Sequence, residues 1–193
     1  INLFGVGGRN TGLITYTSLA VVFISSVQLN SSFAIQKVVK AFAFAGIFNV
    51  AYCLLSIAGI ELIPWNNIYG QILGTFGNPN FQSAFMGMTA ASSFIWTIFG
   101  HGALRARILT GLLVVLAMFN VYLSSEQGYL NFLAGVTAGV VIYFFTTGRS
   151  KAGWTLIALS SLGATLIILG IFNSGPLANL IYKSSLQARG FYW

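Results

Sequence analysis

The sequence predicts an all-α fold, in the form of a polytopic membrane bundle with about six transmembrane helices. Of the 193 residues, 56% are hydrophobic and 6% are charged, whereas about a quarter of the residues in a soluble domain are charged. The apolar runs are also too many and too long for one water-surrounded core, and in lipid such runs satisfy their backbone groups only as helices. We therefore expect residues 1–193 to form a single transmembrane domain.

Six apolar runs are candidate membrane spans. Each is near the roughly 20 residues that cross a bilayer, and none contains Asp, Glu, Lys, Arg or His. Small residues recur within two of them, as Gly87 with Ala91 and Gly135 with Gly139, and such pairs let helices approach closely. The amides of Asn49 and Asn120 also lie within spans, where we expect them to bond between helices. The predicted spans are residues 11–28, 41–60, 81–100, 108–123, 129–147 and 153–172.

The loops between these spans alternate in charge, and this alternation predicts their sides. Three loops are basic, with Lys37 and Lys40, Arg105 and Arg107, and Arg149 and Lys151. The loops at residues 61–80 and 124–128 contain one acid each, Glu61 and Glu126, and no Lys or Arg. The positive-inside rule makes the basic loops cytoplasmic and places both chain ends on the outer side.

Three basic residues run against this orientation, because Arg9, Lys183 and Arg189 would lie outside. Such residues are the better candidates for function, and the alternative that they are scattered solvated charges stays open. Arginine's planar fork binds phosphate oxygens in pairs. Because the other basic residues are dispersed through short loops, anionic membrane lipids explain the net charge of +7 better than nucleic acid does.

The most turn-rich stretch is residues 74–81, which separates the second and third spans. Gly77 and Pro79 cannot continue a helix there. We expect Asn78 or Asn80 to cap the helix that Phe81 opens, with free N–H groups turned toward the loop in an arrangement that suits an anion. No metal or cofactor is predicted, because His101 is the only histidine and no Cys, Asp or Glu completes a ligand set.

Four stretches resemble the O-antigen ligase and O-antigen polymerase superfamily. Residues 74–81, GTFGNPNF, look like its G-T-x-G-N-P-N turn, and residues 8–16, GRNTGLITY, resemble its arginine-glycine entry to a helix. Residues 189–193, RGFYW, are similar to its R-x-x-x-W element, which leads into a large extracytoplasmic loop. Residues 124–128, SSEQG, stand where members often have Ser-Arg-Gly, so Gln127 replaces an arginine.

The resemblance implies an inverting, metal-independent glycosyltransferase. Such an enzyme moves a glycan from an undecaprenyl-pyrophosphate carrier to an acceptor on the outer face of the bacterial inner (cytoplasmic) membrane. The implied roles fall on Arg9 and Arg189, which would hold the pyrophosphate. With this function the substrate-binding residues also include Asn78 and Asn80, which would shape the loop, and Glu126, which would orient an arginine or have no role. No catalytic residue is assigned.

The resemblance also implies that the chain is a central fragment. Ligase members place the histidine that acts on the acceptor beyond the large loop, and this sequence ends before that point. The chain also begins with Ile1 and lacks a cleavable signal pattern, so we expect it to be a piece of a longer protein.

A second class of function stays open, namely a non-enzymatic transporter or accessory subunit that packs with partner membrane subunits in a larger complex. Spans without a buried ionisable group argue against an ion-coupled pump.

Overall fold

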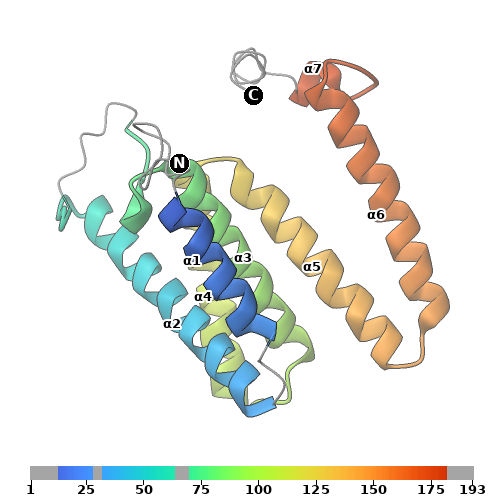
Figure 1. Cartoon of the computed structure of the whole chain (residues 1–193), viewed down its shortest axis with the longest axis horizontal. Coiled ribbons are helices and arrows are strands. Elements are labelled where there is room, and N and C mark those ends of the chain that lie inside the picture. Colours follow the sequence, from blue (N-terminus) through green and yellow to red (C-terminus); the bar gives the residue numbers. More distant parts are fainter. Residues whose placement is uncertain (1–12, 28–31, 64–69, 182–193) are drawn as a thin grey trace. The chain divides into compact units, whose positions relative to one another are not determined.

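The structure is a computed structural model that describes residues 13–27, 32–63 and 70–181, where every regular element is helical (Figure 1). The predicted all-α bundle is confirmed. The chain divides into two compact units, residues 1–45 and 46–193, with the boundary inside α2. The elements are α1 (Leu13–Val27), α2 (Ser32–Ile57), the 3-10 helix η1 (Gly74–Phe76), α3 (Pro79–Phe99), α4 (Leu104–Ser124), α5 (Gln127–Thr146), α6 (Ser150–Ile171) and α7 (Ala178–Ile181).

Four of these helices are long and apolar enough to cross a membrane, so the protein is a membrane protein by the length and composition of its helices. The four segments are Gln36–Ile57, Leu104–Ser124, Gln127–Thr146 and Ser150–Ile171. In α1 the apolar helix is shorter, Tyr16–Val27. All six predicted spans therefore coincide with helices, and the crossing of the membrane by α1 and α3 stays a prediction.

The helices extend beyond the apolar runs at their basic ends. Lys37 and Lys40 lie in the first turns of α2, and Arg105 and Arg107 lie in the first turn of α4, where the sequence placed loops. Long basic side chains can hold their charge in the interface while their backbone continues the helix. A hydropathy window therefore places these helix starts too late.

Helix α3 is the centre of the second unit. It packs most extensively against α4 and α5, while α6 packs against α5. The apolar core lies between α3, α4 and the part of α2 that belongs to this unit, and it consists of Val50, Met86, Ala90, Leu113, Ala117 and Val121. Helix α3 also buries Gln82, Ser83, Thr89 and Ser93. Helix α3 is less hydropathic than the four spans named above because these polar side chains face protein. A central helix exposes less of its surface to lipid.

The contact between α3 and α5 depends on small residues. A Cβ atom added to Gly87 would lie 2.2 Å from the carbonyl oxygen of Gly128, and one added to Gly135 would lie 2.6 Å from the Cβ of Ala91. A Cβ on Gly139 would meet the side chain of Ile95 at 2.6 Å. The close approach predicted from the two small-residue pairs is confirmed.

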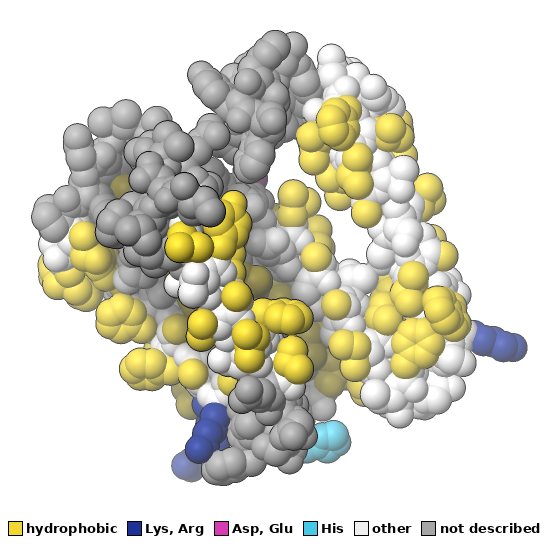
Figure 2. Space-filling view, viewed as in Figure 1, with side chains coloured by type: hydrophobic (Ala, Val, Ile, Leu, Met, Phe, Trp, Pro, Cys, Tyr) yellow, Lys and Arg dark blue, Asp and Glu magenta, His cyan; other side chains and the backbone are white. Residues whose placement is uncertain are grey.

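Large apolar side chains cover much of the visible surface of the second unit, including the length of α6 (Figure 2). In α6 the side chains of Leu159 and Leu162 are 61% and 59% exposed. Apolar surface on this scale is unusual for a monomer in water and is normal for helices that face lipid.

Candidate functional site

The turn before α3 is ordered by Asn78, which is the N-cap of that helix. Its backbone is extended, with φ −145° and ψ 124°, and its side chain accepts hydrogen bonds from the N–H groups of Asn80 and Phe81 at 2.8 and 3.4 Å. The carbonyl oxygen of Asn78 accepts from Gln82 N at 3.0 Å, and Pro79 fills the first helical position. The predicted cap is confirmed, and Asn78 is the residue that forms it.

The expectation of free N–H groups at this helix start is wrong for Asn80, Phe81 and Gln82. The carboxamide and carbonyl of Asn78 already occupy their donors. The N-cap side chain occupies the N–H groups that an anion would otherwise bind. An anion at this helix start would therefore interact with the helix dipole and not with free N–H groups.

The turn before α3 is joined to the loop between α4 and α5. Asn80 Oδ1 accepts a hydrogen bond from Ser125 Oγ at 2.7 Å, across 45 residues of sequence. Ser83 Oγ accepts from Gly128 N at 2.9 Å and donates to the carbonyl oxygen of Ser125. We call residues 78–83 and 124–128, which these bonds bring together, the polar cap of the bundle.

Residues 72–76, which lead into the polar cap, are tied to α2, α3 and α4. Thr75 Oγ1 donates to Asn49 Oδ1 at 2.8 Å, and Ile72 N donates to the carbonyl oxygen of Leu123 at 3.1 Å. The rings of Phe76 and Phe85 lie with their centroids 5.3 Å apart. Asn49 therefore bonds between elements, as predicted, and fixes the turn that precedes the cap.

On the buried side of the polar cap, an amide pair joins α3 to α4. Gln82 Nε2 donates to Asn120 Oδ1 at 3.3 Å, and Ser124 Oγ donates to the same oxygen at 3.0 Å. Gln82 is fully buried and Asn120 is 1% exposed. Among the described residues, Gln82 Oε1 and Asn120 Nδ2 find no hydrogen-bond partner. The predicted interhelical role of Asn120 is confirmed, and sequence reasoning missed Gln82, whose only signal is a glutamine within the apolar run that opens α3.

The structure brings three of the five predicted site residues to one end of the bundle. Asn78 and Asn80 are half-buried, and Glu126 is exposed beside Ser125, at the N-cap position of α5. In the described part of the chain no hydrogen bond engages the Nδ2 atoms of Asn78 or Asn80, so these donors are available to a ligand. Arg9 and Arg189 lie outside the described residues, as does Lys183.

The described basic residues of the second unit lie at the opposite end. Helices α3 to α6 run alternately in opposite directions (Figure 1), so the end of α3, the start of α4, the end of α5 and the start of α6 share one side. We call this side the basic end, and within the described ranges it carries His101, Arg105, Arg107, Arg149 and Lys151. Arg107 Nε donates to the carbonyl oxygen of Thr97 at 2.8 Å, and Thr97 and Thr110 share a hydroxyl hydrogen bond of 2.7 Å.

Potential metal ligands do not cluster in the part of the chain that the structure describes. No group of three or more His, Cys, Asp or Glu side chains there is placed to hold a metal ion. The chemistry available at the polar cap is therefore that of amides, hydroxyls, one carboxylate and the N-termini of α3 and α5.

We expect Gly74→Ala to loosen the polar cap. Gly74 has a φ of +57°, and an added Cβ would lie 2.0 Å from Gln82 Oε1. The left-handed conformation costs about 1–2 kcal/mol for an L side chain, and displacement of Gln82 adds to it. Thermal unfolding in detergent should show a larger loss of stability for Gly74→Ala than for Gly70→Ala, which shares a positive φ of +65° but has nothing within 4 Å. Equal losses of stability in the two variants would mean that Gln82 does not pack against Gly74.

Comparison with known protein families, with curated proteins and with solved structures finds no match to this chain. The function is therefore inferred from the residues themselves.

Proposed function

We propose that this chain is the donor-side part of a membrane glycosyltransferase of the O-antigen ligase and polymerase type. The substrate is a glycan on an undecaprenyl-pyrophosphate carrier, and the site lies on the outer face of the bacterial cytoplasmic membrane. The observation that carries the proposal is the joining of residues 74–81 to residues 124–128 through Asn80 and Ser125. Two of the four stretches that resemble the superfamily thus form one polar surface.

The position of the polar cap fits an extracytoplasmic site. It lies at the end of the second unit opposite to the basic end, and by the positive-inside rule the basic end faces the cytoplasm. Lipid-linked glycans that have been flipped across the membrane are presented on the other side.

The groups of the polar cap suit a phosphate only as auxiliary ligands. The Nδ2 atoms of Asn78 and Asn80 can each donate to an oxygen, and the N-termini of α3 and α5 favour negative charge by about 0.3–1 kcal/mol each. These contributions are too small to hold a doubly charged pyrophosphate. The proposal therefore assigns the pyrophosphate to the guanidinium groups of Arg9 and Arg189, with Glu126 orienting one of them.

The chemistry of the transfer follows from this assignment. The acceptor hydroxyl attacks the anomeric carbon, the bond from that carbon to the phosphate oxygen breaks, and undecaprenyl pyrophosphate leaves. The two guanidinium groups stabilise the negative charge that develops on the leaving oxygen. The base that takes the hydroxyl proton is not assigned to a residue of this chain.

One observation favours the non-enzymatic alternative, an accessory subunit of a larger membrane complex. The side-chain oxygens of Asn78, Asn80, Ser83 and Ser125 are all hydrogen-bonded to groups within the polar cap, as expected for a contact that only fixes two loops.

The replacement Arg189→Lys separates the two functions. In lipid nanodiscs, a clamp that uses the arginine fork should bind undecaprenyl pyrophosphate about tenfold more weakly in this variant, because lysine offers a point charge. The matched control is Arg149→Lys at the basic end, which should bind as the unchanged chain does. Equal binding by both variants, or no preference of the unchanged chain for the pyrophosphate over the monophosphate, would favour the accessory subunit.

A further inference from the structure

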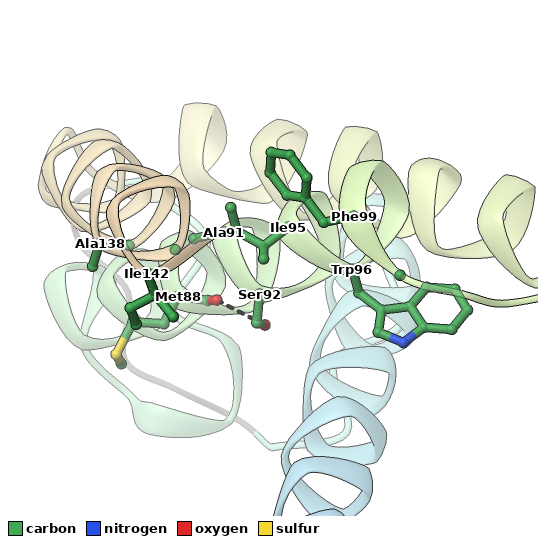
Figure 3. Close-up of a pocket in the computed structure, with 11 residues that line it drawn as sticks. Met88, Ala91, Ser92, Ile95, Trp96, Phe99, Ala138 and Ile142 are labelled. Carbon is green, nitrogen blue, oxygen red and sulfur yellow. Dashed lines mark hydrogen bonds between the residues drawn. The ribbon is translucent and has the colours of Figure 1, made fainter. Parts of the chain in front are cut away.

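A groove between α3 and α5 is lined almost wholly by apolar side chains (Figure 3). Its volume is about 570 Å³, within the ~300–1,000 Å³ of typical ligand pockets. Met88 and Trp96 of α3 and Ala138 and Ile142 of α5 form its sides. The one hydroxyl in the lining, of Ser92, donates to the carbonyl oxygen of Met88 in its own helix at 3.0 Å. The groove therefore suits a hydrocarbon occupant.

The dimensions of the groove match one lipid chain. It extends along α3 from Met88 to Gly100, which is about 18 Å of helix at about 1.5 Å per residue. One leaflet of a bilayer has a hydrocarbon depth of about 15 Å, half of the ~30 Å core. The floor is closed, because Gly135 lies against Ala91 and Gly139 against Ile95. An acyl chain can lie along such a groove, in contact with the apolar side chains of both helices.

The groove ends at the basic end of the bundle. Phe99 and Gly100 form its last part, and His101 and Arg105 follow directly with exposed side chains. Arg149 and Lys151, also exposed, follow the end of α5. Among the described residues the two acids, Glu61 and Glu126, belong to other loops, so no carboxylate there balances the charges of Arg105, Arg149 and Lys151. Basic pockets between transmembrane helices on the cytoplasmic side favour anionic headgroups.

We propose that the α3–α5 groove is a binding site for an anionic membrane phospholipid of the phosphatidylglycerol class. One acyl chain fills the groove, and the phosphate lies among the basic residues that follow α3 and α5. This site is separate from the polar cap and does not depend on the glycosyltransferase proposal.

Native mass spectrometry of the full chain with phosphatidylglycerol or phosphatidylcholine of identical acyl chains tests the apolar part of the site. The unchanged chain should retain phosphatidylglycerol preferentially. Ala138→Phe fills the groove and should abolish retention, whereas Ala164→Phe, an exposed position on α6 outside the groove, should leave it unchanged. Both alanines are exposed, so neither change disturbs a packed core.

The charged part is tested by replacing Arg105 and Arg149 together. The double glutamine variant should bind phosphatidylglycerol about 30-fold more weakly, because each basic residue near an anionic lipid contributes to the electrostatic attraction. The double lysine variant keeps both positive charges and should bind the lipid normally.

Three results would overturn the proposal. These are equal retention of the two lipids, retention of phosphatidylglycerol by Ala138→Phe, and a dimer of the chain that only Ala138→Phe abolishes. The last result would assign the groove to a second copy of the protein.

Discussion

Replacement of Gly87 by alanine is expected to destabilise the second unit by about 3 kcal/mol, at the upper end of the usual cost of overpacking. The added methyl would lie 2.2 Å from the carbonyl oxygen of Gly128 and 2.9 Å from its Cα. Both are backbone atoms, so no side chain can turn away and α3 and α5 must separate. Unfolding by a denaturing detergent in mixed micelles, followed by circular dichroism, measures the loss.

The control for this change is Gly163→Ala in α6. That glycine is also helical, and an added Cβ there has nothing within 4 Å. Alanine at that site should be neutral or slightly stabilising, because it is the better helix former. A similar loss of stability at both positions would show that replacing glycine within a helix causes it, and not the contact between α3 and α5.

The second large effect is expected at the buried amide pair. Asn120→Leu removes the acceptor of both Gln82 and Ser124. Ser124 can turn to a carbonyl of its own helix, but the fully buried amide of Gln82 is left without any partner. An unsatisfied buried group costs about 1–3 kcal/mol, and we expect the upper part of that range.

The double variant Gln82→Leu with Asn120→Leu tests the reason for this loss. If the cost comes from an orphaned amide, replacement of both partners by apolar side chains should recover most of the stability. A double-mutant cycle in the same unfolding assay gives the coupling between the two positions. Losses that simply add would contradict the pairing.

The helices were predictable because the signal is local. A run of apolar residues without charge specifies a helix in lipid wherever it occurs, and all six predicted runs lie on helices. The helix starts were not predictable to the same degree. The sequence placed Lys37 and Arg105 in loops because they are charged, yet a charged side chain can remain on a helix whose end reaches the interface.

The polar cap was predictable only in its local part. The capping of α3 by Asn78 depends on residues within one turn, and the same rule implies that the first N–H groups are occupied and not free. The bond of Asn80 to Ser125 depends on how α3, α4 and α5 pack, which hydropathy does not encode. Gln82 was missed for a related reason, since a polar residue in an apolar run acquires meaning only when its partner on another helix is known.

The difference in burial between α3 and α6 determines how many substitutions each helix tolerates. Helix α6 buries only Gly153 and Gly170, whereas α3 buries eight residues of mixed chemistry, Gln82, Ser83, Met86, Gly87, Thr89, Ala90, Ala91 and Ser93. Exchanges among leucine, isoleucine and valine along α6 change little besides the surface offered to acyl chains. At the eight buried positions of α3 an exchange alters a neighbour, so random mutagenesis under selection for folding should leave α6 variable and these α3 positions nearly fixed.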